Sequence, residues 1–495
     1  MLGQLNTTLG TSHTLDTPSL SSLLEECIAK NWNFGMAYSR LRRIWYTRNW
    51  STVRDTLREW EEADREMRRK ALVGNRIVKP DLPPRRVWDL CSNRVVPYWC
   101  MGIPTREMVW RLRPISHAWM DETHRVNMST PINGCEWPVP MPKDASLNLV
   151  RIEMLNLRAE YVWLDVLCLR QVGRQQEDMR VEEWKLDVPT IGAVYDASWD
   201  VVIYLSGLGR PLTLKEGDLD SDRCWFRRAW TLQEVGIRRV IAGDTPDGPL
   251  HAKRKNRKYK TALLTRFHKQ LRSTEDISNT KVFDVLKEMQ TRVSTNPVDK
   301  VAGLAFLVRS RSIPAYYESE SFEDAWTALV NLVPVWSRGR LFLSYPEPGN
   351  AGTKWRPSWD QLMMMHLPAD TDPGIYVDRN EEMGEDWCDA ECIEKGLVRG
   401  LAVVEGSDRH GELIVKDAGE TEHAFNVTAT HEYPIPDDTY TLFYAGGWLS
   451  QYCVIGRRLP GKRFEKVSVL EIPDRDEWRR LEDLRIMKKC RNVLV

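Results

Sequence analysis

Between residues 87 and 345 the sequence alternates between short apolar runs and longer amphipathic runs, and this alternation constrains the fold most. The apolar runs are typical of β-strands, and the runs between them have the spacing of helices. Strands that alternate with helices of this length predict βαβ units and a mainly parallel α/β sheet. We expect strands at 113–119, 161–168, 200–206 and 239–242, and helices at 147–158, 175–184, 189–198 and 222–237. Ligands of such sheets bind beyond the carboxyl ends of the strands.

The sequence on either side of this region differs in composition and in its pattern of apolar residues. We expect residues 1–20, rich in Ser, Thr and Gly, to be disordered, and residues 21–78 to form a helical segment that ends at the Pro-rich run KPDLPPRR. Short β-branched and aromatic runs from 346 to 495 predict an antiparallel β-rich region, closed by a helix at 476–489. Three further helices are expected at 261–271, 278–293 and 296–308.

The composition excludes several classes of protein. Lys plus Arg and Asp plus Glu each number 70, so no global charge would draw the chain to nucleic acid or to an anionic membrane. No apolar run is long enough to span a bilayer, and the N-terminus has no signal-peptide pattern. The ten cysteines have no regular spacing, which predicts mostly free thiols and a cytoplasmic protein. Cys388 and Cys392 with the downstream histidines do not match a zinc spacing, so we expect no metal.

Two acidic residues interrupt runs that are otherwise apolar. Asp165 lies within YVWLDVLCLRQ, read as a buried strand, and Glu234 lies near the end of CWFRRAWTLQEV, read as a helix. An ionised carboxylate in an apolar setting is costly unless it is paired, hydrogen-bonded or used. Both are therefore candidate catalytic residues. The structural alternatives are a surface pair of Glu234 with Arg238, and an Asp165 that accepts backbone N–H bonds or pairs with Arg228.

Two further features have a structural and a functional interpretation. Cys168 together with His117 would suggest a nucleophile and its base, but a buried cysteine is more often a small core residue. The basic run HAKRKNRKYK at 251–260 would suit anion binding or nuclear localisation, but such runs are more often solvated loops. The chain also has no glycine-rich dinucleotide fingerprint after a strand and no P-loop.

Four blocks in the central region occur in the order of a known family. They are ISHAW at 115–119, YVWLDVLCLRQ at 161–171, CWFRRAWTLQE at 224–234 and NPVDKVAGLAFLV at 296–308. Together they resemble the fungal heterokaryon-incompatibility (HET) domain, which would occupy residues 87–345 with its core motifs at 113–242. The resemblance implies a fungal allorecognition protein that triggers regulated cell death and acts through self-association or another incompatibility protein.

HET domains are in turn similar to TIR domains, which have a flavodoxin-like sheet. A TIR pattern, Trp-Cys-Leu-x-Glu-Leu after a strand that ends in Ser, is matched here by the strand at 200–206 and by WTLQEV at 230–235. The chain departs from the pattern by Thr231 in place of Cys and by about twenty extra residues before the helix. In TIR enzymes that cleave NAD the Glu of this pattern is catalytic, which implies the same role for Glu234.

This resemblance makes NAD a possible substrate rather than a bound cofactor. Nicotinamide leaves NAD as a neutral molecule, so the site needs mainly a carboxylate that stabilises positive charge on the ribose. Glu234 and Asp165 are the catalytic candidates. The pocket would be lined by Ser116, His117, Trp119, Ser206 and Trp230. The second hypothesis is a non-catalytic module that assembles through exposed Trp-rich surfaces and recruits a partner.

Overall fold

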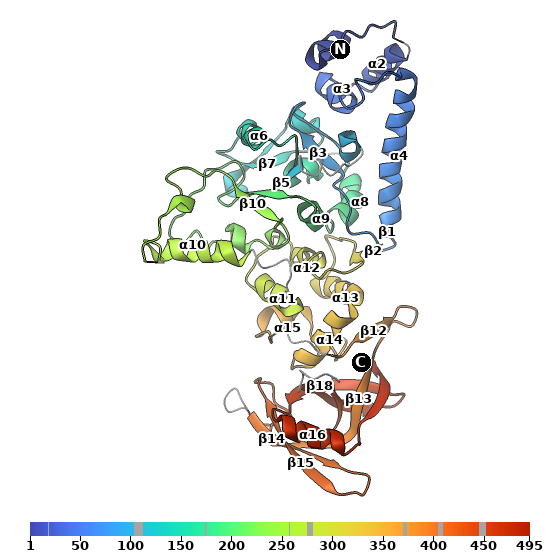
Figure 1. Ribbon diagram of the computed structural model, residues 1–495, viewed down its shortest axis with the longest axis vertical. Helices are drawn as coiled ribbons and strands as arrows, with labels where there is room; N and C mark the ends of the chain where they lie inside the picture. Colours follow the sequence, from blue (N-terminus) through green and yellow to red (C-terminus); the bar gives the residue numbers. More distant parts are fainter. Residues whose placement is uncertain are drawn as a thin grey trace. The chain divides into compact units, whose positions relative to one another are not determined.

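The apolar runs of the central region form a six-stranded sheet in the computed structural model, in the order β10-β9-β5-β8-β3-β4 (Figure 1). The neighbours β10–β9, β9–β5 and β5–β8 are parallel, and β8–β3 and β3–β4 are antiparallel. The strands are β3 (Arg86–Asp89), β4 (Arg94–Pro97), β5 (Leu112–His117), β8 (Tyr161–Trp163), β9 (Asp200–Tyr204) and β10 (Arg238–Ile241). The sheet is therefore mixed, with four parallel strands and an antiparallel hairpin at one edge.

The structure describes residues 1–495 except 18, 103–111, 174–175, 257, 275–280, 370–373, 404–408 and 445–451. The chain divides into two units. The first unit comprises Met1–Ser278, Arg292–Leu307 and Ser312–Ser319; the second comprises Asn279–Thr291, Val308–Arg311 and Glu320–Val495. The expected helical segment 21–78 thus belongs to the first unit, and residues 320–345, expected in the central domain, belong to the second.

Helices and small sheets complete the first unit, which is mixed α/β. Its helices are α1 (Leu2–Leu9), α2 (Leu20–Ala29), α3 (Phe34–Leu41), α4 (Val53–Ala71), α6 (Leu147–Asn156), α7 (Asp165–Cys168), α8 (Glu177–Asp187), α9 (Ile191–Asp196), α10 (Ala262–Ser273) and α12 (Val298–Ala305). The small sheets are β1 (Leu72–Val73) with β2 (Arg76–Ile77) and β11 (Ile313–Pro314), and β6 (Arg125–Met128) with β7 (Val139–Pro142). The strands expected at 113–119, 200–206 and 239–242 and most of the expected helices are confirmed to within a few residues. Residues 175 and 278–280, expected to be helical, lie outside the described residues.

The helix expected at 222–237 is wrong. Two short 3-10 turns, η5 (Trp225–Arg227) and η6 (Trp230–Leu232), take its place. The Ala229 N–H donates to the Val293 carbonyl at 2.9 Å, and the Val293 N–H donates to the Arg227 carbonyl at 2.6 Å. The Ala229 N–H and the Arg227 carbonyl are therefore not available for hydrogen bonds within an α-helix. Glu234 therefore does not lie on a helix.

Three other expectations also differ from the structure. The strand expected at 161–168 stops at Trp163, and Asp165 begins α7. Residues 2–9 are helical rather than disordered, because Leu5 is fully buried in a cluster with Leu24 and Trp45. The helix expected at 476–489 ends at Asp483, since β19 (Lys488–Leu494) pairs with a neighbouring strand over its whole length.

The second unit is built on an antiparallel β-rich sheet, as predicted, in the order β12-β13-β14-β15-β18-β17-β16. A further pairing of β13 with β16 closes the path on itself, and β19 pairs with both β13 and β18. The strands are β12 (Val377–Asn380), β13 (Glu385–Arg399), β14 (Arg409–Lys416), β15 (Glu422–Ala429), β16 (Asp438–Tyr444), β17 (Tyr452–Leu459), β18 (Arg463–Glu471) and β19. The helices of this unit are α11 (Val282–Gln290), α13 (Phe322–Leu332), α14 (Val335–Ser344), α15 (Trp359–Met364) and α16 (Arg475–Asp483).

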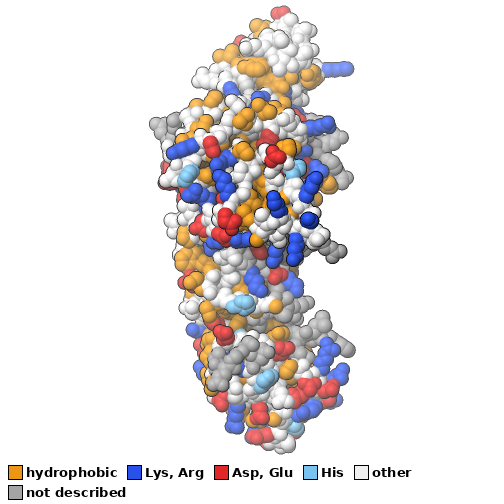
Figure 2. Space-filling model, turned by 90° about the vertical axis from the view of Figure 1, so that its left-hand side faces the viewer, with side chains coloured by type: hydrophobic (Ala, Val, Ile, Leu, Met, Phe, Trp, Pro, Cys, Tyr) orange, Lys and Arg blue, Asp and Glu red, His pale blue; other side chains and the backbone are white. Residues whose placement is uncertain are grey.

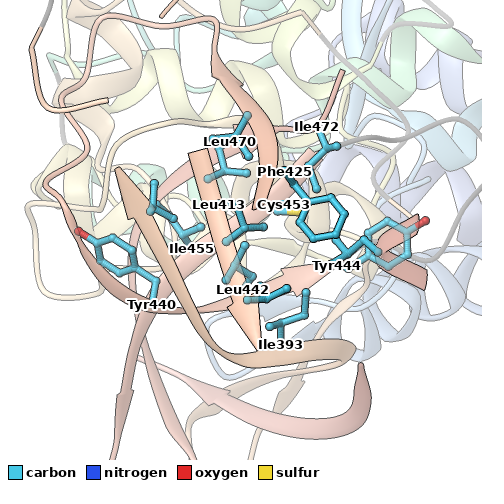
Figure 3. Packing of buried hydrophobic residues seen from close by; sticks show 14 of the residues in the cluster. Ile393, Leu413, Phe425, Tyr440, Leu442, Tyr444, Cys453, Ile455, Leu470 and Ile472 are labelled. Atoms are coloured by element: carbon cyan, nitrogen blue, oxygen red, sulfur yellow. The ribbon is translucent and has the colours of Figure 1, made fainter. Parts of the chain in front are cut away.

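Alternate residues of these strands fill the interior of the second unit. Leu413, Phe425, Leu442, Ile455 and Leu470 come from five different strands and point toward one another (Figure 3). A disulfide joins Cys392 of β13 to Cys490 of β19, and the other eight cysteines form no disulfide. Most cysteines therefore keep their thiols, as predicted, but the sequence did not indicate the pair that is joined.

The charged side chains on the surface and the polarity of the helices agree with what the composition predicts. Basic and acidic side chains are interspersed on the face that Figure 2 displays. Within the described part of the chain, every helix is too short or too polar to cross a membrane. The described residues of the basic run 251–260 lie in a mostly exposed loop, which is the interpretation that the sequence favoured; residue 257 lies outside them.

Gly243 offers a test of how tightly the loops at the end of the sheet are packed. It has a φ of +66°, and a Cβ at this position would lie 2.3 Å from the Arg210 carbonyl oxygen. Gly74 has a φ of +58° with open space around it. Gly74→Ala should lower stability by about 1 kcal/mol through the left-handed backbone alone. Gly243→Ala should lower the thermal midpoint several degrees further, because backbone must move. Equal midpoints for the two variants would contradict this packing.

Candidate functional site

The candidate site begins at the last two residues of the central strand β5. Ser116 and His117 are polar residues at the carboxyl end of this strand, and both are buried. β5 lies between β8 and β9, and it runs parallel to both. The ends of these strands therefore meet at one edge of the sheet, where the chain can bring polar groups from different segments together.

Glu234 is bound to Ser116 inside the first unit. The Ser116 hydroxyl donates to Glu234 Oε2 at 2.6 Å, and the Trp225 indole N–H donates to Ser116 Oγ at 2.7 Å. Glu234 is only 9% exposed. Burial raises the pKa of the Glu234 carboxyl to about 7 from an ordinary value of 4.5; the Ser116 hydrogen bond opposes this shift, and the Asp165 charge adds to it. Glu234 is therefore an acid that titrates near neutral pH.

Tyr195 is a buried neighbour of the two carboxyls. Its hydroxyl donates to the Ile115 carbonyl at 2.9 Å. Burial and the nearby Glu234 and Asp165 carboxyls raise the pKa of this hydroxyl well above its ordinary value, so Tyr195 stays neutral at physiological pH.

Asp165 is the second carboxyl of the site and has the opposite character. It accepts from the Trp119 indole N–H at 2.8 Å and from the Val166 backbone N–H at 2.7 Å, and its Oδ1 lies 2.8 Å from His117 Nε2. Burial alone would raise the pKa of Asp165, but the His117 charge and these hydrogen bonds outweigh burial and lower it. For His117, burial favours the neutral ring, yet the adjacent carboxylate raises its pKa overall. Both shifts favour an Asp165 carboxylate beside a protonated His117 ring.

The two carboxyls differ in exposure as well as in charge. The Asp165 side chain is 22% exposed, whereas Glu234 lies behind Ser116. They are close enough for the Asp165 charge to raise the pKa of Glu234. The His117 and Trp119 rings are stacked, with centroids 5.8 Å apart. Two acids whose pKa values are pushed in opposite directions are the usual arrangement of a general acid or base beside an electrostatic stabiliser.

The structure brings together five of the residues proposed from sequence and separates two others. Ser116, His117, Trp119, Asp165 and Glu234 form the network described above. Ser206 instead exchanges hydrogen bonds with Thr213, both at 3.1 Å. Trp230 lies against the Tyr316 ring at 6.4 Å and is hydrogen-bonded to Asp299. Trp230 and Glu234 belong to the same sequence motif, but their side chains lie in different surroundings.

The structural alternatives can also be compared with the contacts. The Glu234–Arg238 surface pair is wrong, because Arg238 pairs with Asp200. Asp165 accepts a backbone N–H, as the structural interpretation expected, but its charged partner is His117 and not Arg228. Burial raises the pKa of the Cys168 thiol to about 12, so Cys168 is a neutral core residue at physiological pH.

A cavity of about 230 Å³ lies beside this network at the ends of β5 and β9. Ala118 and Met120 follow β5, and Leu205 and Ser206 follow β9. Of the pocket residues expected from sequence, only Ser206 lines it. Cys224 and Phe226 also line it, and Trp225 between them donates to Ser116. Residues next to the network in the sequence therefore line the cavity, but the two acids do not.

Sequence reasoning missed several residues of the site. Besides Tyr195 and Trp225, they include Gln233, which is 4% exposed and has no hydrogen-bond partner for either amide atom among the described residues. Arg292 is 2% exposed, donates to the Thr231 hydroxyl at 2.9 Å and lowers the pKa of Glu234. Arg292 lies 58 residues beyond Glu234 in a segment with no motif, so no local signal connects them.

Comparisons with known proteins found no relative of this chain. No family model matches the chain, and no curated protein and no solved structure is significantly similar to it. Within the described ranges, no group of three or more His, Cys, Asp or Glu residues is arranged to hold a metal ion. The functional interpretation therefore rests on the residues of this chain.

The raised pKa of Glu234 predicts how stability depends on pH. A folded-state pKa above the unfolded value means that the protonated carboxyl stabilises the fold fully below about pH 4.5. This contribution is lost as the pH rises through about 7. Glu234→Gln cannot ionise, so it should gain stability relative to the native protein between pH 5 and pH 8, by on the order of 3 kcal/mol at most. Thermal midpoints over this range would measure it.

The exposed Glu216 provides the matched control. Glu216→Gln removes the same charge from the surface of the same unit, and its midpoint should follow the native protein at every pH. If Glu234→Gln also runs parallel to the native protein, Glu234 is not a buried acid with a raised pKa.

Proposed function

We propose that the first unit is a HET-type domain that cleaves the N-glycosidic bond of NAD as part of a fungal cell-death response. The observation that carries the proposal is the network of Glu234, Ser116, His117 and Asp165 at the carboxyl ends of parallel strands. In chain order the four parallel strands lie as 2-1-3-4, which is the order of a flavodoxin-like sheet without its last strand. This order supports the TIR-like fold that the motifs imply.

The chemistry suits two carboxyls that differ in charge. Cleavage builds positive charge on the ribose, and nicotinamide leaves without needing a proton. Asp165, ionised and partly exposed, is the carboxylate that a ribose can approach. Glu234 adds a second negative charge when it ionises near pH 7, in surroundings shielded from water where such charge acts strongly. His117 and Trp119 orient Asp165, and the stacked rings beside it offer a flat surface.

Nicotinamide release by the purified full chain tests this proposal. At high protein concentration, which favours assembly, NAD should be cleaved, and the rate should rise as the pH passes through about 7, because Glu234 must ionise. Glu234→Gln and Asp165→Asn should each lower the rate at least ~100-fold, since each removes charge that acts in the transition state.

Asp299→Asn is the matched control. Asp299 is a largely buried carboxyl of the same unit, 2.8 Å from the Tyr316 hydroxyl and outside the network, so its amide should keep the activity. Full activity in Glu234→Gln, or no nicotinamide from any assembled form while expression still kills cells, would contradict the enzymatic proposal.

One observation favours the second function, a non-catalytic assembly module. Helix α6 buries Leu147, Val150 and Met154 on one face and exposes Leu149, Ile152 and Leu155 on the other. Their exposed fractions are 62%, 51% and 38%, and they recur every third residue, so they form a continuous apolar stripe. Exposed apolar stripes mark interaction surfaces. This stripe supports self-association through α6.

Substitution on α6 tests the assembly module. Ile152→Lys should shift the mass measured by light scattering from oligomer to monomer and should abolish killing. Val181→Lys is the control, because Val181 is an exposed apolar residue on a different helix, α8, with 43% exposure. A native protein that stays monomeric at high concentration, or an Ile152→Lys variant that still assembles, would exclude this surface.

A further inference from the structure

A second cavity lies in the N-terminal part of the first unit. It has a volume of about 280 Å³ and lies among α2, α3 and α4, with walls completed by the end of β4 and by η2 (Tyr98–Met101). Nothing in the NAD proposal uses it. Its lining combines the cations Lys30, Arg40, Arg54 and Arg58 with the aromatic rings of Trp32 and Trp99.

The cations of this cavity outnumber the acids that could neutralise them. Two carboxylates, Glu26 and Glu61, also line it. Glu26 pairs with Lys30 at 2.7 Å and with Arg54 at 3.0 Å, and Glu61 pairs with Arg65 at 2.6 Å. In the part of the chain that the structure describes, neither Arg40 nor Arg58 has a carboxylate within ion-pair distance. Two guanidinium groups therefore remain to bind an anion, which arginine does with paired N–H donors.

The rest of the lining is apolar and aromatic. The Arg40 guanidinium lies 4.4 Å from the centre of the Trp32 ring, which holds it by a cation–π contact and limits its freedom before any ligand binds. Cys27 is 1% exposed, and burial raises its thiol pKa to about 11, so it is an apolar wall and not a reactive group. Leu23 and Leu57 add aliphatic surface. The cavity thus has a cationic part and an aromatic part.

The volume limits the size of the ligand. A cavity of roughly 150 Å³ holds benzene, so this cavity, nearly twice as large, holds one ring with a charged head group and no whole dinucleotide. We propose that this cavity binds a small planar aromatic anion, an aryl phosphate or an aryl carboxylate. Arg40 and Arg58 bind the anionic group, and the Trp32 and Trp99 rings pack against the aromatic ring.

Ligand binding here would join the N-terminal helices more firmly to the sheet. Arg42, which directly follows α3, already pairs with Asp89 of β3 at 3.2 Å and with Glu160 at 2.8 Å, and Arg43 pairs with Glu160 at 3.3 Å. A ligand that contacts α3 and α4 as well as the end of β4 adds to these links. Binding to the folded state alone raises its apparent stability, so it is measurable as a thermal shift.

Four probes separate the parts of the proposed ligand. Phenyl phosphate and benzoate carry both a ring and a charge, inorganic phosphate carries only the charge, and benzyl alcohol carries only the ring. Calorimetric titration of the full chain at low salt should show binding of phenyl phosphate or benzoate in the micromolar to millimolar range, with a raised thermal midpoint. Inorganic phosphate and benzyl alcohol should bind at least tenfold more weakly. The stronger aromatic anion identifies the head group.

Substitutions identify the site. Arg40→Gln and Arg58→Gln should each weaken binding at least tenfold, and Arg58 is exposed, so its variant retains the fold even if Arg40→Gln does not. Arg69→Gln on the same helix α4 is the control, because Arg69 pairs with Glu66 and does not line the cavity. No binding of either aromatic anion at 10 mM, equal binding of the neutral ring, or native affinity in Arg58→Gln would each overturn the proposal.

Discussion

The hydrogen bond from Ser116 to Glu234 is the interaction on which the arrangement of the site depends. It joins the end of the central strand to the loop after η6, across 118 residues of sequence, at 2.6 Å. A buried carboxyl is tolerated only when it is neutral or well bonded, and here both conditions apply. Trp225 donates to the same serine, so its indole ring is held by the same contact. The bond to Ser116 also holds the Glu234 carboxyl where the Asp165 charge raises its pKa.

Elements with a strong local pattern could be predicted from the sequence, and elements with distant partners could not. The strand at 200–206 is a short apolar run, and β9 is buried along its whole length. The strand at 239–242 pairs with it in parallel at the edge of the sheet and is only partly buried. The run CWFRRAW is rich in aromatic residues and lies between two predicted strands, so the sequence suggested a helix there. What decides its conformation is backbone pairing with Val293, about 65 residues later, and no local rule contains that information.

The same reasoning explains which parts of the site could be found. Ser116 and His117 were predictable because parallel strands present their carboxyl ends at one edge of the sheet, where ligands bind. Ser206 satisfies the same rule, yet its hydroxyl turns to its own loop at Thr213. Trp230 was assigned because it belongs to the Glu234 motif, but a 3-10 turn rotates successive side chains by about 120°. Its ring consequently packs on Tyr316 rather than beside Glu234.

The sizes of the two cavities bear on how the unit would handle a dinucleotide. At about 230 and 280 Å³, each is smaller than the roughly 300–1,000 Å³ of a pocket that encloses a whole ligand of drug size. The residues that line the cavity at β5 and β9 include neither of the two carboxyls. A substrate would therefore have to reach them from the exposed side of Asp165, whose side chain is 22% exposed. Glu234 is only 9% exposed and its carboxyl is bound to Ser116, so it would act on such a substrate through its charge rather than by direct contact.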